Sequence, residues 1–213
     1  MELYTIGHSN HNLDTFISLL KQHQITALAD VRSHPYSRYL SHFNKSPLQN
    51  SLKQEKIAYV FLGQELGARP NNELCYINGK AIYEKIAATE LFQQGIERLI
   101  KGVKKYRVAL MCAEKDPLTC HRTILVCKRL KSYDFKIKHI LSNGEVETHE
   151  DLENRLLAKQ GFTQFTPNNN PLQLSLFDTN ESQKDSLNKE ECLQQAYHQQ
   201  GESIAYVQPQ ENK

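Results

Sequence analysis

The stretch RVALMCAEKDPLTCHRTILVCKRLK, residues 107–131, decides the fold. Its beginning, Arg107 to Cys112, is an apolar run of strand length, and this pattern is typical of a strand that is buried on both faces. A polar loop follows, and a helix is expected over about Thr119 to Lys131. A buried strand that leads into a helix predicts a sheet of the α/β class.

The same alternation continues on both sides of this stretch. Apolar runs predict further strands, and helical spacing or helix caps predict the helices between them. The expected strands cover residues 3–6, 25–31, 57–62, 107–112 and 136–141, and the expected helices begin near residues 13, 47, 89, 119 and 148. We therefore expect an α/β fold with a mainly parallel open sheet of about five strands and helices on both faces.

Composition divides the chain into two parts. Fifteen of the 52 residues in 162–213 are Asn or Gln, and this stretch has no sustained periodicity. We expect an α/β domain over residues 1–161 and a mostly disordered polar tail over 162–213, with a marginal helix near 189–199. The tail holds seven acids and three bases, net −4, so residues 1–161 carry a net charge of +6. A basic domain is a weak indicator of phosphate-bearing partners.

The chain has the composition of a cytoplasmic protein. Of its 213 residues 39% are hydrophobic, and no apolar run approaches the ~20 residues that a membrane helix needs. The first residues lack the pattern of a signal peptide. Five cysteines without a disulfide-domain spacing fit reduced thiols. We expect a cytoplasmic location and no membrane partner.

Ionisable residues cluster where the expected strands end. His8 follows the first strand, Asp30 and Arg32 lie at the end of the second, and Glu114 follows the fourth. In open α/β sheets, ligands bind beyond the carboxyl ends of the strands. We therefore expect a functional site at this edge of the sheet.

Asp30 and Glu114 are the candidate catalytic carboxylates. Two carboxylates in one crevice could divide acid and base work, or could hold a divalent cation through oxygen ligands. An alternative for Asp30 is an ion pair with Arg32 that fixes the loop. His8 is a candidate general base, proton donor or metal ligand, and a purely structural histidine is its alternative.

The segment Cys120-His121-Arg122 falls in the first turn of an expected helix. A helix N-terminus offers free N–H groups and a positive dipole, which favour anions. Arg122, with His121, would strengthen phosphate binding. Arg122 could instead form a structural pair with Asp30 or Glu114.

The cysteines allow two interpretations. Cys120 at a helix start is a candidate nucleophile with a lowered pKa, and a buried apolar filler is the alternative. The spacing of Cys112 and Cys120 matches no zinc pattern, since neither Cys-x₂-Cys nor His-x₃-His occurs here. Cys112 also lies too far before Arg122 for a phosphatase loop, which needs five residues between cysteine and arginine.

The loop after the second expected strand, residues 33–45, interleaves basic and aromatic residues around Arg38. Such loops suit nucleic acid or nucleotides, because aromatic rings stack on bases and cations bind phosphates. The alternative is an ordinary lid packed by Tyr36, Tyr39 and Phe43.

Several of these motifs resemble those of one known family. They are Thr5-Ile-Gly-His-Ser9, Asp30-Val-Arg32 with Pro35, Leu66-Gly67, and Cys112-Ala-Glu114 followed by Pro117, Cys120, His121 and Arg122. Together they are similar to the family catalogued as domain of unknown function 488, over roughly residues 2–160. The resemblance implies the fold and the site, and it supplies no reaction.

The tail contains a peptide that resembles the motif by which bacterial DNA polymerases and repair proteins dock on the sliding clamp. The motif is Gln173-Leu174-Ser-Leu176-Phe177. An extended segment of this kind places Leu176 and Phe177 in an apolar pocket while Gln173 bonds at the rim. Alternatively, the leucines dock on the core of the protein itself.

These patterns predict an enzyme that acts on nucleic acid or nucleotides in DNA repair or defence, recruited by the sliding clamp. It would hydrolyse a phosphodiester or a glycosidic bond. The expected phosphate-binding residues are Arg32, Arg38 and Arg122, and the expected catalytic or metal-binding residues are Asp30 and Glu114, assisted by His8 or His121. The alternatives are a non-catalytic DNA-binding adaptor and a thiol-dependent enzyme, for sulfur transfer or redox chemistry, that uses Cys120.

Overall fold

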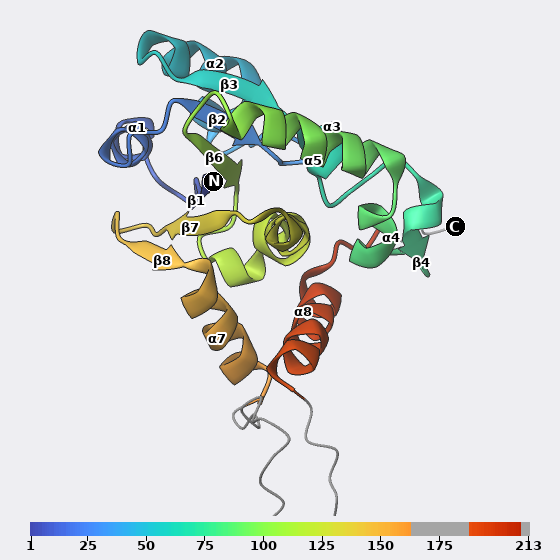
Figure 1. Ribbon diagram of the computed structural model, residues 1–213. Helices are drawn as coiled ribbons and strands as arrows, with labels where there is room; N and C mark the ends of the chain where they lie inside the picture. The colour runs from blue at the N-terminus through green and yellow to red at the C-terminus, as the bar shows by residue number, and fades with distance from the viewer. Residues whose placement is uncertain (163–187, 210–213) are drawn as a thin grey trace, which may run out of the picture.

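The computed structural model describes residues 1–162 and 188–209, and a six-stranded sheet lies at its centre (Figure 1). In spatial order the strands are β3 (Ala58–Phe61), β2 (Ala27–Asp30), β6 (Val108–Cys112), β1 (Glu2–Gly7), β7 (Lys136–Ile140) and β8 (Val146–Thr148). The first five are parallel, and β8 pairs antiparallel with β7. The mainly parallel sheet is confirmed, and β8 is the strand that was not expected.

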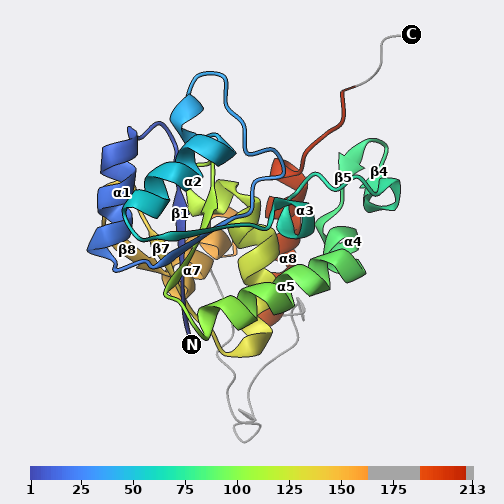
Figure 2. The same ribbon diagram turned by 90° about the horizontal axis from the view of Figure 1, so that it is seen from above.

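Helices cover both faces of this sheet. They are α1 (Leu13–Gln22), α2 (Lys45–Gln54), α3 (Gly63–Leu66), α4 (Tyr83–Ala87), α5 (Glu90–Val103), α6 (Lys128–Leu130), α7 (His149–Lys159) and α8 (Lys189–Ile204). Shorter helical turns are η1 (Ser41–Phe43), η2 (Glu73–Cys75), η3 (Pro117–Thr119), the π-helical η4 (Arg122–Cys127) and η5 (Lys131–Tyr133). A hairpin of β4 (Tyr76–Ile77) and β5 (Lys80–Ala81) lies apart from the main sheet. Figure 2 shows α1 and α2 on one side, with α5 and α8 on the other.

Strand β6 shows why the sheet has two apolar faces. Its residues Val108, Leu110 and Cys112 belong to the core shared with α5, η4, α7 and α8. The intervening Ala109 and Met111 belong to the second core, which α1 and α2 cover. Because successive side chains of a strand point to opposite faces, a continuous apolar run buries both.

Local capping explains where the helices begin. The side chain of Thr89 accepts a hydrogen bond from the N–H of Phe92, and α5 starts directly after Thr89. Thr148 caps α7 in the same way. The helix expected to begin at Pro47 begins two residues earlier, because proline is tolerated in the first turn, where its missing N–H has no helical partner.

Residues 188–209 return to the domain, so the boundary expected at residue 161 needs correction here. The marginal helix expected near 189–199 is the 16-residue α8, which packs against α7 and η4. Its buried residues include Cys192, Leu193, Ala196 and Tyr197. Their helical spacing forms an apolar stripe that the Asn/Gln-rich composition concealed. The peptide 173–177 lies outside the described residues.

A buried chain of hydrogen bonds attaches α8 to the sheet. Thr5 Oγ1 lies 2.8 Å from His139 Nδ1, and His139 Nε2 lies 3.0 Å from His149 Nδ1. The Tyr197 hydroxyl lies 3.1 Å from His149 Nε2 and donates to Glu153 Oε1 at 2.9 Å. Burial lowers the pKa of both imidazoles, that of His149 to about 4, so both are neutral at pH 7. A neutral imidazole donates one hydrogen bond and accepts one, and the hydrogen bonds from Thr5 to Tyr197 need this pattern at both histidines.

Among the described residues, no helix combines the length and apolar character needed to cross a membrane.

We expect acidification to destabilise the fold. Below about pH 6.5 the unfolded chain binds a proton on each of these histidines, whereas folded His149 stays neutral down to about pH 4. The free energy of unfolding therefore falls as the pH decreases through this window, by up to about 3 kcal/mol from His149 alone. Urea unfolding at a series of pH values measures this slope.

His149→Gln should flatten the slope, and His34→Gln, at an exposed histidine, should leave it unchanged. Equal slopes in the wild type and His149→Gln would contradict the assignment.

Candidate functional site

A pocket of about 320 Å³ opens at the carboxyl edge of the sheet, between the segments that follow β2, β6 and α8. We call it the site pocket. Its polar lining includes two arginines, two histidines, one carboxylate and three tyrosines, namely Arg32, Arg69, His34, His121, Glu114, Tyr36, Tyr83 and Tyr206. The structure thus brings Arg32, Glu114 and His121 of the predicted site residues to one cavity.

Asp30 forms the ion pair that was its alternative interpretation. Its Oδ1 accepts from Arg32 Nε at 2.9 Å and from the Arg32 backbone N–H at 3.1 Å. Its Oδ2 accepts from Arg32 Nη2 and from the Tyr59 hydroxyl, each at 2.7 Å. Asp30 is completely buried and does not line the site pocket. Four hydrogen bonds saturate the carboxylate, so the structure does not pair Asp30 with Glu114 in the cavity.

His8 also contacts the guanidinium of Arg32. Its Nδ1 lies 2.9 Å from Ser9 O, its Nε2 lies 3.2 Å from Arg32 Nη1, and its ring stacks on Phe43 with centroids 4.3 Å apart. Burial and the neighbouring Arg32 lower the pKa of His8 to about 4. The neutral ring therefore donates through Nδ1–H and accepts through Nε2, which leaves no lone pair for a catalytic base.

Arg32 is consequently a rigid cation in the wall of the pocket. Its Nη2 donates to Phe43 O at 2.8 Å as well as to Asp30. Together with the contacts of Nε and Nη1, four of its five N–H groups have partners. The remaining Nη1–H has none among the described residues. A fixed guanidinium with one free donor suits an anionic ligand.

Cys120 lies between Glu114 and the start of the helix. Its Sγ is 3.1 Å from Glu114 Oε2 and accepts from the Arg122 N–H at 3.4 Å. The backbone of Cys120 is extended (φ −132°, ψ 136°), so it precedes the first helical turn in which it was expected. The sulfur therefore takes the place of a capping oxygen at the N-terminus of this helix.

Cys112 and His121 complete the cluster. Cys112 Sγ lies 3.6 Å from His121 Nδ1, and His121 Nε2 lies 2.9 Å from Val31 O. Because the carbonyl accepts the Nε2 proton, Nδ1 presents its lone pair to the thiol when the ring is neutral. Burial lowers the pKa of His121, but its contact with Cys120 outweighs burial and raises it. Both residues line the site pocket, whereas Cys120 is buried behind them.

The protonation states in this cluster depend on one another. Burial and the charge of Cys120 raise the pKa of Glu114. Burial disfavours the Cys120 thiolate, but the hydrogen bond from Cys112 and the charge of Arg122 outweigh it and lower the thiol's pKa. The protonation of Glu114 and the protonation of Cys120 are therefore linked through their direct contact.

Arg122 is a structural cation rather than a lining residue of the pocket. It is completely buried, and its Nη1 donates to Glu114 O at 2.8 Å. Two longer contacts of 3.4 Å reach Lys115 O and Thr5 Oγ1. The loop after β6 also lies directly against Gly7, where a Cβ would come within 1.9 Å of Glu114 O. Only glycine allows this approach.

The loop between β2 and α2 is only partly packed. Phe43 is buried, as the lid interpretation requires, but Tyr36 and Tyr39 are 73% and 91% exposed. Tyr36 lines the site pocket, whereas Arg38 does not. The exposed rings are free to stack on a ligand.

Arg69, Tyr206 and Tyr83 are among the lining residues that were not predicted from the sequence. Arg69 follows α3, and its guanidinium lies over the ring of Tyr206, 4.3 Å from the centroid. Tyr206 belongs to the segment assigned to the tail, and its carbonyl accepts from the N–H of Ala81 at 2.8 Å. Tyr83 begins α4. The one sequence signal for Tyr206 is the apolar run 204–207 within a polar stretch.

A family model described as "Domain of unknown function DUF488" matches residues 12–128, more than half of the chain. The chain belongs to the DUF488 family. The matched region includes Arg32, Glu114 and the whole Cys112–His121 cluster. Comparison with curated proteins and with solved structures finds no match.

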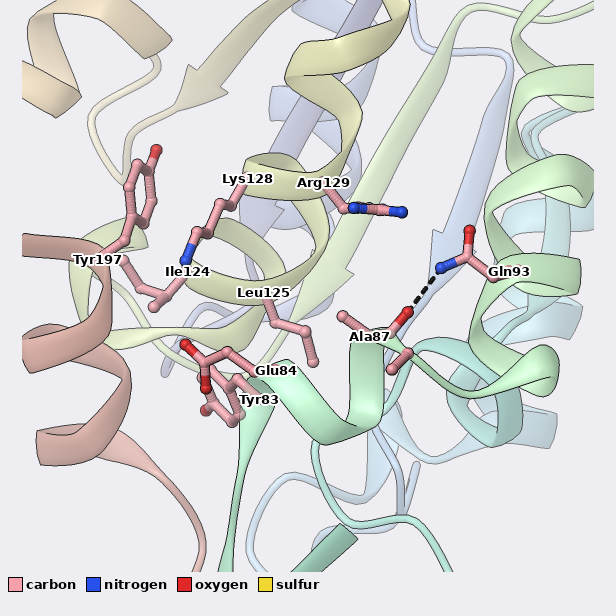
Figure 3. Close-up of a pocket in the computed structure, with 10 residues that line it drawn as sticks. Tyr83, Glu84, Ala87, Gln93, Ile124, Leu125, Lys128, Arg129 and Tyr197 are labelled. Atoms are coloured by element: carbon pink, nitrogen blue, oxygen red, sulfur yellow. Dashed lines mark hydrogen bonds between the residues drawn. The ribbon is translucent and has the colours of Figure 1, made fainter. Parts of the chain in front are cut away.

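A second pocket shares Tyr83 with the site pocket, and Figure 3 shows the residues that line it. It is larger, about 480 Å³, with Ile124 and Leu125 in its wall and Lys128 beside Tyr197. No cysteine or histidine is among the described residues that line it. The smaller site pocket is therefore the candidate functional site.

We expect Asp30→Ala to lower the free energy of unfolding by about 3–5 kcal/mol, because it leaves Arg32 buried without its counter-ion. Glu55→Ala is the control. It breaks the solvent-exposed pair with Lys21 and should cost at most about 1 kcal/mol. Urea denaturation measures both, and similar small losses would contradict the structural role of Asp30.

Proposed function

We propose that this DUF488 protein is an enzyme that hydrolyses a phosphate-bearing substrate, a nucleotide or nucleic acid, in the site pocket. One observation carries the proposal: Arg32 and Arg69 line the same small cavity as the carboxyl group of Glu114. Cations bind the phosphate, and the carboxyl group supplies acid–base chemistry next to it.

Substrate binding would use the buried and the exposed side of the pocket differently. Arg32 offers one fixed N–H donor, held by Asp30 and His8. Arg69 is exposed and adds a second cation over Tyr206. Tyr36, exposed at the rim, can stack on a base. This combination of phosphate-binding cations and a stacking ring favours a nucleotide unit over a simple anion.

Glu114 is the proposed acid–base residue. It is the one carboxylate among the described residues that line the pocket. His121 lines the same wall, with Nε2 fixed by Val31 O. Hydrolysis of a phosphodiester bond and of a glycosidic bond both need a group that protonates the leaving oxygen or activates water, and Glu114 can serve either.

Turnover of labelled nucleotides and of damaged or branched DNA tests this proposal. Glu114→Gln should lower kcat about 100-fold or more, since it removes the proton-transfer group. Arg69→Ala should raise KM about 10-fold, the effect of one charge-assisted contact. Lys105→Ala removes the same charge at the opposite edge of the sheet, just before β6, and should behave as the wild type.

DNA binding without turnover, unaffected by Glu114→Gln, would contradict the enzyme and favour a non-catalytic adaptor.

A thiol-dependent reaction, sulfur transfer or redox chemistry, is the second candidate. The observation that favours it is the contact of Cys120 with Glu114, next to Cys112 and His121. A thiol enzyme would lose turnover on alkylation of Cys120 and keep it in the presence of metal chelators.

We also propose that the peptide 173–177 recruits the protein to the bacterial sliding clamp, which would place it in DNA repair or defence. Its support is the motif alone, in the chain that connects α7 with α8.

The intact protein should bind the clamp with micromolar affinity, and the double variant Leu176→Ala, Phe177→Ala should lose this binding, because these side chains fill the apolar pocket of the clamp. Surface plasmon resonance measures it. The double variant Phe165→Ala, Leu187→Ala removes the same residue types outside the motif and should bind normally. If the intact protein does not bind the clamp, the proposal that the sliding clamp is a partner is wrong.

A further inference from the structure

We propose that Cys112, Cys120 and His121 bind a zinc ion at the floor of the site pocket. The proposal rests on the proposed function, because it supplies the hydrolytic water that Glu114 would deprotonate. The three residues are buried, and their potential ligand atoms lie within 4.8 Å of one another.

The separation of Cys112 Sγ and His121 Nδ1 matches a tetrahedral zinc site. With Zn–S of about 2.3 Å and Zn–N of about 2.0–2.1 Å, the sulfur and nitrogen atoms at two corners of a tetrahedron lie about 3.6 Å apart. Cys112 Sγ and His121 Nδ1 are 3.6 Å apart. Zinc could therefore enter without a change in the backbone between the two residues.

The surroundings orient the three ligands as in established zinc sites. His121 donates its other ring N–H to Val31 O at 2.9 Å, which directs the Nδ1 lone pair toward the sulfur atoms. The N–H of Arg122 points at Cys120 Sγ at 3.4 Å, and buried Arg122 supplies a positive charge that favours thiolates.

Three protein ligands leave one position of the tetrahedron open. Cys112, His121 and Glu114 all line the site pocket, so the open position faces the substrate cavity. Glu114 Oε2 lies 3.1 Å from Cys120 Sγ, beside the three ligands. Catalytic zinc sites have this composition, and two cysteines, one histidine and an adjacent glutamate also serve hydrolytic deamination of nucleobases on other folds.

The donor types select the metal. Thiolates and imidazole favour zinc over magnesium or calcium, which prefer oxygen. The divalent-cation site expected from Asp30 and Glu114 lacks this support, because the carboxylate of Asp30 is saturated by Arg32 and Tyr59.

Titration of the full-length reduced protein with Co²⁺, followed by displacement with Zn²⁺, tests the site. We expect one equivalent of Co²⁺ per chain with thiolate charge-transfer and tetrahedral d–d absorption. Cys112→Ser and Cys120→Ser should each lose these bands or weaken binding at least 100-fold. Cys75→Ser, at a buried cysteine outside the cluster, should keep them. Circular dichroism checks that the variants are folded.

If the serine variants fail to fold, the wild-type spectrum decides, because two thiolates give about twice the charge-transfer intensity of one. Absence of these bands in the reduced wild type overturns the zinc site. The proposed nucleotide hydrolysis is tested separately, by the turnover assay described above. Bands that persist in a folded Cys120→Ser variant also overturn it. Zinc binding without nucleotide turnover supports the metal site and contradicts the substrate class.

Discussion

The burial of Arg122 is the constraint on which the site depends. A buried cation costs the fold several kcal/mol unless hydrogen bonds compensate for the lost water. Three of the five N–H donors of Arg122 reach the carbonyls of Glu114 and Lys115 and the hydroxyl of Thr5. These contacts fix the loop after β6 against β1, where Gly7 allows the close approach. The positions of Glu114 and Cys120 follow from that attachment.

The same constraint extends to the C-terminal helix. Thr5 contacts Arg122 on one side and begins the chain of hydrogen bonds through His139 and His149 on the other. This chain ends at Tyr197 of α8. The segment after α8 then supplies Tyr206 to the site pocket. The segment 188–209 is therefore part of the folded unit that encloses the site pocket, although it lies beyond the matched region of the DUF488 family.

The sequence was informative where periodicity and topology govern structure. The apolar run 108–112 predicts a buried strand, and parallel strands necessarily gather Arg32 and Glu114 at one edge. Strand β8 was missed because its three residues, two of them exposed, give no apolar pattern.

Side-chain pairing within the site could not be predicted. Asp30 faces Arg32 and not the cavity, and Tyr59 of β3, a residue far along the chain, adds the fourth hydrogen bond to its carboxylate. Likewise, the convergence of Cys112, Cys120 and His121 depends on how a seven-residue loop closes, which spacing rules for zinc motifs do not describe. Contacts between residues far apart in the sequence determine both the orientation of Asp30 and the convergence of the two cysteines with His121.

We expect ligands to bind at the carboxyl edge of the sheet, in the cavity of Arg32 and Glu114. Titration of ¹⁵N-labelled protein with a nucleoside monophosphate, followed by ¹H–¹⁵N NMR, tests it most directly. We predict saturable shifts of the amides of Ser33, Arg69 and Glu114, which surround this cavity. Shifts confined to Leu125 and Lys128 in the second pocket, or no shifts at all, would contradict the account.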